Sequence, residues 1–287
     1  MGTDSDNIVE EMSTGIKIAV FFAKVLRKIK LQAFVRNIRA RASLELFRIL
    51  HENVIHTSRL LGESMKDWNI REKETTRLAQ DVCTSSRKLM ANLLELKPEF
   101  LHCCIKVLQA SEANNIPSKN EVITWIRSEP SDARPLDPKP HIVEQNTVWS
   151  ALLGCYDGAY NWKLSFKCFS SNNLSGHDEF NNSRDNWKQF YHSVLVFPIH
   201  YLTYNESGQP IKNVMGFLAF DSPLKNAFGN APDIFYYKDS PSKRAEYDTL
   251  LSNSTAFQIG AVIADTLGVF LSSAYSQNAD SKDIKCQ

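Results

Sequence analysis

The side chains with the clearest chemical potential lie in two short clusters. His177-Asp178-Glu179 is a tight group of ionisable residues, and His102-Cys103-Cys104 places an imidazole beside two thiols. The first cluster lies among Gly, Asn and Ser residues, which is typical of a solvated turn. In the second cluster, neighbouring residues of a strand point to opposite faces, and no second Cys/His pair has ligand spacing. We therefore expect core thiols there and no metal site.

Recognised catalytic motifs do not occur in the 287 residues: there is no phosphate loop, HExxH, G-x-S-x-G or kinase signature. We predict that the protein is not an enzyme, and the sequence names no cofactor. Six cysteines without CxxC or framework spacing, and a start without a secretory signal, favour a cytoplasmic location. The net charge of +1 gives no global case for nucleic acid as a partner.

The elements that must position any site are organised around residues 193–223. Two apolar runs, 193–202 and 211–223, flank a polar segment at Ser207-Gly208, a pattern that predicts an antiparallel hairpin. The runs are too continuous for a sheet with one solvated face, so both faces should be covered. Residues 257–271 are apolar around most of a helical circumference and predict a closing helix.

The rest of the chain adds further helices and strands. We expect helices over 42–64 and 75–96, separated by a break around Trp68, and a short helix over 146–153 capped by Asn146. Strands are expected over 100–108, 121–127 and 162–169, and a loop over 226–252. In the first of these strands His102, Cys104 and Lys106 should share one face. A brief helix should carry Trp187 and Phe190.

Residues 15–41 differ sharply from the acidic stretch 1–14, for which we expect disorder. The segment has eight basic residues and no acidic one, and its apolar residues recur at spacings of three and four. Three interpretations remain open: a dimerising or packing helix, a membrane-surface helix, and a nucleic-acid-binding helix, the last disfavoured by the scarcity of aromatic residues. The residues expected to engage a membrane or partner are Lys17, Phe22, Lys24, Arg27 and Lys28.

Two motifs resemble the GAF domain family of small-molecule-binding modules. Residues 191–199 (YHSVLVFPI) are similar to the family's strand ending in Val-Pro-Ile. Residues 214–222 (VMGFLAFDS) are similar to its strand ending in Asp-Ser, where Gly216 would permit close packing, and residues 257–271 look like its final helix. The bilin-attaching cysteine, the cyclic-nucleotide residue set and the grouped redox cysteines of some members have no counterpart here.

The resemblance implies an α+β fold with a twisted antiparallel sheet of five or six strands. The terminal helices would cover one face, and a ligand pocket would lie under loops on the other. It divides the chain into a disordered tail (1–14), a basic amphipathic helical extension (15–41), a GAF-like domain (42–275) and a polar tail (276–287). The residues that we expect near the pocket are Trp149, Tyr156, Cys168, His177 and Trp187.

The function expected from this resemblance is that of a cytosolic sensor or regulatory protein. A small effector would bind in the pocket, and the signal would pass through a homodimer or through a partner. The alternative is a ligand-free dimerisation scaffold whose basic helix engages a membrane surface or partner protein. Under this alternative the protein would be peripheral at the membrane.

Overall fold

The computed structural model describes residues 68–110, 120–128, 140–153, 167–184, 186–204, 210–237 and 241–276. All of them belong to one compact unit, residues 61–287. The predictions for the tail 1–14, the basic segment 15–41, the helix 42–64 and the tail from 277 onward lie outside the described residues.

Six strands form one antiparallel sheet in the order β3-β2-β1-β6-β5-β4. They are β1 (His102–Ala110), β2 (Asn120–Arg127), β3 (His141–Ile142), β4 (Phe169–Ser171), β5 (Ser193–Tyr204) and β6 (Pro210–Ser222). The predicted hairpin is confirmed, because β5 pairs with β6 from Ser193↔Ser222 to Tyr204↔Pro210. The non-sequential pairing of β1 with β6 joins the two halves of the sheet. The fold is therefore α+β, as the sequence predicts.

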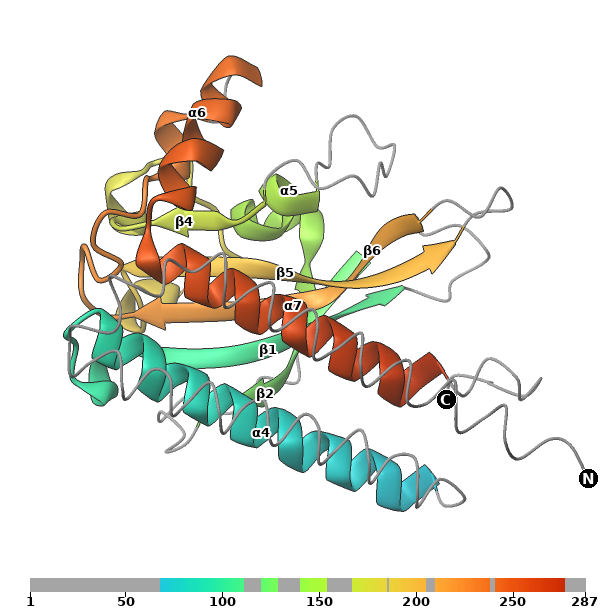
Figure 1. The fold of residues 1–287 in the computed structure, drawn as a ribbon. Coiled ribbons are helices and arrows are strands. Elements are labelled where there is room, and N and C mark those ends of the chain that lie inside the picture. The colour runs from blue at the N-terminus through green and yellow to red at the C-terminus, as the bar shows by residue number, and fades with distance from the viewer. Residues whose placement is uncertain are drawn as a thin grey trace, which may run out of the picture. The chain divides into compact units, whose positions relative to one another are not determined.

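Two long helices, α4 (Trp68–Leu93) and α7 (Thr255–Ser276), lie side by side across one face of the sheet (Figure 1). Gly268 allows α7 to lie close to β5, because a Cβ there would lie 2.1 Å from the carbonyl oxygen of His200. Every residue from Ser193 to Ile199 is buried, which confirms that both faces of β5 are covered. The shorter elements are α5 (Thr147–Leu153), α6 (Pro241–Ser252), η1 (Pro98–Phe100), η2 (Val143–Gln145), η3 (Leu174–Gly176), η4 (Trp187–Gln189) and η5 (Ile234–Tyr236).

Three local predictions need correction. The expected break around Trp68 is wrong, since α4 begins there; neither Gly nor Pro falls between residues 63 and 96 to interrupt it. The expected loop 226–252 contains α6, a helix that buries only a narrow stripe with Tyr247 and Leu251 four residues apart. Pro241 at its first position was the available start signal. The strand expected over 162–169 begins at Phe169, and residues 154–166 lie outside the described chain.

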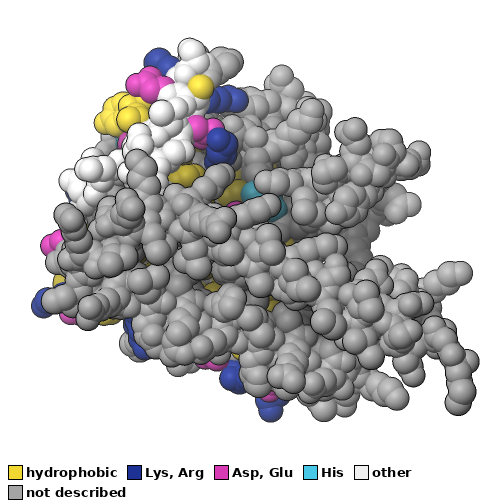
Figure 2. Space-filling view, in the orientation of Figure 1, with side chains coloured by type: hydrophobic (Ala, Val, Ile, Leu, Met, Phe, Trp, Pro, Cys, Tyr) yellow, Lys and Arg dark blue, Asp and Glu magenta, His cyan; other side chains and the backbone are white. Residues whose placement is uncertain are grey.

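The surface around α6 is largely polar, with Lys or Arg and Asp or Glu side chains close together (Figure 2). No single described helix combines the length and apolar character needed to cross a bilayer. The segments 242–252 and 255–271 meet that criterion only jointly and are bent by 91°.

Candidate functional site

A cavity of about 50 Å³ lies on the sheet face opposite α4 and α7. The alternation along β1 separates the two faces, since Cys104 and Lys106 line the cavity whereas Cys103 contacts Cys83 of α4. The predicted shared orientation of Cys104 and Lys106 is thus confirmed. The residues lining the cavity are Cys104, Lys106, Arg127, His141, Asn146, Val148, Trp149, Asn182, Arg184, Tyr191, Val194, Val196, Ala219 and Asp221.

The floor of the cavity depends on close contact between β1 and β6. A Cβ at Gly216 would lie 2.2 Å from the carbonyl oxygen of Lys106, so only glycine lets the two backbones approach this closely. The β1–β2 pairing also shifts register between Ile105 and Lys106. A bulge of this kind re-aims side chains. Here the extra residue is Trp125 of β2, so the alternation along β1 that directs Lys106 to the cavity is unbroken.

The wall of the cavity is built by α5. The Asn146 side chain accepts a hydrogen bond from the Val148 backbone N–H at 3.0 Å, which confirms the predicted cap. The helix that follows packs the Trp149 ring against Phe217 of β6, with the ring centroids 4.8 Å apart. Trp149 is thereby held over the sheet and beside Lys106.

The segment 182–184 completes the lining. His141 Nδ1 lies 2.6 Å from Ser183 Oγ, and the Asn182 amide donates to the Tyr191 hydroxyl. These two contacts connect the segment to β3 and to Tyr191, which precedes β5. They place Arg184 at the cavity.

The cavity carries an unusual concentration of charge for a buried surface. Lys106 is 8% exposed, Arg127 9% and Asp221 7%. The Lys106 ammonium donates to Thr124 Oγ1 at 2.6 Å and lies 5.7 Å from the centroid of the Trp149 ring. The pKa of Lys106 is lowered to about 8, chiefly by burial; Cys104 and Asp221 act to raise it, and Arg127 and Arg184 act to lower it.

Two further titratable groups of the lining, His141 and Cys104, are neutral at physiological pH. Burial, followed by repulsion from Lys106, Arg184 and Arg127, lowers the pKa of His141 to about 2. Burial raises the pKa of the Cys104 thiol. Neither group therefore changes the positive balance of the cavity near pH 7.

Of the five residues expected near the pocket, Trp149 lines the cavity. Trp187 packs on Tyr191, a lining residue, with ring centroids 5.7 Å apart. Tyr156 lies outside the described residues. His177 belongs to a second polar cluster at the β4 edge of the sheet, and the backbone carbonyl of Cys168 accepts a hydrogen bond from that cluster.

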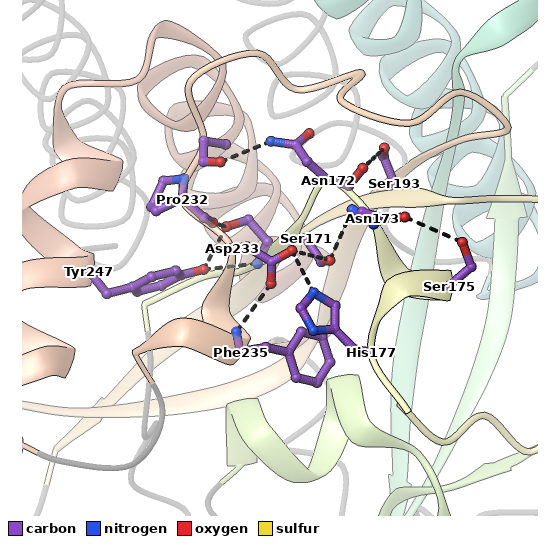
Figure 3. A network of polar contacts seen from close by, with 12 residues as sticks. Ser171, Asn172, Asn173, Ser175, His177, Ser193, Pro232, Asp233, Phe235 and Tyr247 are labelled. Carbon is purple, nitrogen blue, oxygen red and sulfur yellow. Dashed lines mark hydrogen bonds and ion pairs between the residues drawn. The ribbon is translucent and has the colours of Figure 1, made fainter. Parts of the chain in front are cut away.

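The second cluster is centred on the Asp233 carboxylate (Figure 3). Its Oδ2 atom accepts from Ser171 Oγ at 2.8 Å and lies 3.0 Å from His177 Nε2, while Oδ1 accepts from the Phe235 N–H at 3.2 Å. The His177 ring stacks on the Phe235 ring with centroids 4.1 Å apart. The serine contacts the carboxylate rather than the imidazole, so this is not the order of a nucleophilic triad.

Tyr247 of α6 extends the same cluster from within the core. Its hydroxyl accepts from the Ser170 N–H at 2.9 Å, lies 2.7 Å from Ser170 Oγ and donates to the Cys168 carbonyl at 3.3 Å. Burial raises the pKa of the Tyr247 phenol, so it stays a protonated donor. We call the residues Ser170, Ser171, His177, Asp233 and Tyr247 the β4 network.

The charged lining residues Lys106, Arg127, Arg184 and Asp221 were not singled out from the sequence. A signal for the first was present, because Lys106 interrupts an apolar strand that is buried on both faces. Arg127 and Asp221 stand at strand ends, where charges are common, and Arg184 stands in a polar segment. Their convergence depends on the strand order, which no local pattern contains.

No group of three or more His, Cys, Asp or Glu side chains suited to a metal ion occurs within the described ranges. In comparisons with known proteins, no family model matches the chain, and neither does any curated protein sequence.

Proposed function

We propose that this protein is a GAF-like sensor or regulatory module that binds a small effector in the cavity on the sheet face opposite α4 and α7. The observation that carries the proposal is the convergence on one cavity of polar side chains from β1, β2, β3 and β6. Polar groups directed into a recess beside apolar walls are the usual composition of a ligand site. In this cavity Trp149, Val194 and Val196 supply the apolar part.

The architecture supports the same proposal. The GAF resemblance implies an antiparallel sheet with helices from both chain ends on one face and a pocket on the other. The described chain has a six-stranded antiparallel sheet, α4 and α7 on one face and the cavity on the other. Gly216 and Asp221 of the family-like motif take part in the cavity, the former through its backbone contact with Lys106.

A second candidate is a GAF-like scaffold without a ligand, and the size of the cavity favours it. Pockets for drug-sized molecules measure roughly 300–1,000 Å³. At about 50 Å³ the cavity is far smaller than this range. A nucleotide or tetrapyrrole would require the lining to open, whereas a compact molecule would not.

Ligand binding can be tested by following the melting temperature of the full chain across a panel of neutral and charged small metabolites. A ligand that binds only the native state raises the melting temperature in proportion to RT ln(1 + [L]/Kd). The blocking variant is Ala219→Leu, because Ala219 lines the cavity and is 4% exposed. The matched control is Ala227→Leu, since Ala227 is 5% exposed and lies away from the lining.

The proposal predicts a ligand-dependent rise in the wild type and in Ala227→Leu, and its loss in Ala219→Leu. A rise that survives in Ala219→Leu would place the ligand elsewhere. A panel without any response, together with a native mass spectrum free of bound small molecules, would favour the scaffold.

The output of the module is proposed to pass through a dimer, a membrane surface or a partner by way of residues 15–41. The basic residues Lys17, Lys24, Arg27 and Lys28 and the apolar Phe22 carry this part of the proposal. Deletion of residues 1–41 should reduce either the oligomer mass or flotation with anionic liposomes. An unchanged mass and unchanged flotation would contradict a role for the segment in either.

A further inference from the structure

The charges at the cavity do not balance. Lys106, Arg127 and Arg184 face it together with one carboxylate, that of Asp221, among the described lining residues. His141 and Cys104 stay neutral near pH 7, so among the described lining residues Lys106 and Arg127 alone already outnumber the Asp221 carboxylate by one positive charge. Buried charge is unfavourable unless it is paired, so an excess of this kind favours a negatively charged occupant.

The hydrogen-bond inventory of the cavity shows the same imbalance. The Arg127 Nε–H and the Trp149 indole N–H are both buried, and neither has an acceptor among the described residues. Both side chains line the cavity, and at least nine-tenths of each is removed from solvent. Buried donors in native proteins are nearly always paired with protein, water or an ion. Two donors that share a cavity therefore call for an acceptor inside it.

The volume limits what that acceptor can be. A water molecule needs roughly 10–15 Å³ of such space, so about 50 Å³ holds roughly three to five waters. A phosphate or carboxylate group has a comparable number of heavy atoms. Water would satisfy the donors but would leave the charge excess, whereas an oxyanion answers both. Arginine is the side chain best suited to this contact because its planar fork matches phosphate and carboxylate oxygens.

We propose that the cavity binds a compact oxyanion, a phosphate or carboxylate group, held by Arg127, Lys106 and Arg184 with the Trp149 indole N–H as a further donor. The inference rests on the proposed function and names the chemical class of its effector. Trp149 would form an apolar wall beside the anion, and Asp221 would select against larger polyanions by repulsion.

The test measures the melting temperature and the calorimetric affinity of the full chain with two probes, inorganic phosphate and succinate. Sodium chloride keeps the ionic strength constant, which separates site binding from screening. Arg127→Gln removes the cation from the cavity. Arg77→Gln is the matched control. Arg77 is an exposed residue of α4, so this substitution removes the same charge far from the buried cavity lining.

We expect at least one probe to stabilise the wild type and Arg77→Gln equally. Arg127→Gln should bind about tenfold to a hundredfold more weakly, as expected from the loss of charged hydrogen bonds. A response to phosphate alone identifies a phosphate group, and a response to succinate alone identifies a carboxylate. Equal binding by Arg127→Gln would overturn the assignment of the anion to this cavity.

The two proposals fail in different ways. If a neutral metabolite binds and Ala219→Leu abolishes its effect while both anions are inert, the cavity is a ligand site and the oxyanion assignment is wrong. If no compound of either kind binds, both proposals are wrong.

The pH dependence supplies an independent readout. The anion should bind more weakly as the pH rises from about 7 to about 9, because Lys106, with a pKa of about 8, loses its charge. The groups facing this lysine are Arg127, Arg184, Asp221, Cys104 and the neutral His141. In Lys106→Met the affinity should be lower and nearly flat across this range. An equally steep decline in Lys106→Met would contradict the role of Lys106.

Discussion

The cavity and the β4 network are both polar clusters within the same fold, yet they differ in how completely their groups are paired. In the β4 network Asp233 receives three contacts, and the Tyr247 hydroxyl both accepts and donates. At the cavity, Arg127 Nε and Trp149 Nε1 have no acceptor among the described residues, and cations outnumber carboxylates. A polar cluster whose groups are all paired stabilises the fold, whereas a cluster with surplus donors can bind an acceptor from outside the chain.

This difference predicts opposite effects of mutation on stability. Removing a group from a saturated network leaves its partners buried and unpaired, which destabilises the protein. Removing a surplus buried cation relieves desolvation and repulsion, which stabilises it. Residues kept for binding often reduce the stability of the folded protein, so replacing them can increase it.

The largest loss should follow from breaking the centre of the β4 network. Asp233→Ala leaves Ser171 Oγ, His177 Nε2 and the Phe235 N–H without their acceptor. We expect the free energy of unfolding to fall by about 3 kcal/mol, measured by urea denaturation. The control Asp81→Ala removes an exposed helical pair with Arg77 and should change it by less than about 0.5 kcal/mol. Equal losses in the two variants would show that the network contributes no special stability.

Lys106→Met should increase the free energy of unfolding, the opposite of the effect expected for Asp233→Ala. The ammonium is 8% exposed and its pKa is lowered to about 8. Removing it should raise the free energy of unfolding at pH 7 by about 1–3 kcal/mol, after loss of the Thr124 hydrogen bond. A marked loss of stability in this variant would mean that the charge is fully compensated within the chain.

The pH dependence of this gain follows from linkage. Because the folded pKa of Lys106 lies below its unfolded value of about 10.4, the unfolded chain binds more protons between about pH 8 and 10.4. The contribution of Lys106 to stability therefore rises over this range. The difference in the free energy of unfolding between Lys106→Met and the wild type should therefore narrow by up to about 3 kcal/mol. Urea denaturation at each pH measures this difference. The raised pKa values of the Cys103 and Tyr247 side chains act in both proteins and cancel in the difference. The pKa of Cys104, which Lys106 lowers, rises further in Lys106→Met, and this acts in the same direction as the narrowing of the gap. A gap independent of pH would contradict the burial of a charged lysine.

Smaller effects should come from two other members of the β4 network, Tyr247 and His177. Tyr247→Phe leaves the Ser170 N–H and the Cys168 carbonyl without the hydroxyl and should cost about 1–2 kcal/mol. His177→Gln loses the contact with Asp233 and the stacking on Phe235, which should cost about 0.5–1 kcal/mol. Thermal denaturation ranks the two. A larger loss of stability in His177→Gln than in Tyr247→Phe would contradict the expectation that the more deeply buried group contributes more.

The sequence predicted the hairpin 193–223, the closing helix and the first two strands, because each has a local period of apolar residues. It also predicted that Lys106 shares a face with Cys104, since alternation along a strand is local. It missed α6, whose apolar stripe is narrow, and the charged lining of the cavity. Arg127, Arg184 and Asp221 meet only because β1 pairs with both β2 and β6, a long-range arrangement that leaves no periodic trace.

The most direct test compares Lys106→Met with Tyr247→Phe in one set of melting curves, with and without phosphate or succinate. The account predicts that Lys106→Met melts above the wild type at pH 7 but responds more weakly to the anion. It predicts that Tyr247→Phe melts below the wild type and keeps the full response. A full anion response in Lys106→Met, or a lost response in Tyr247→Phe, would contradict the division between a binding cavity and a structural network.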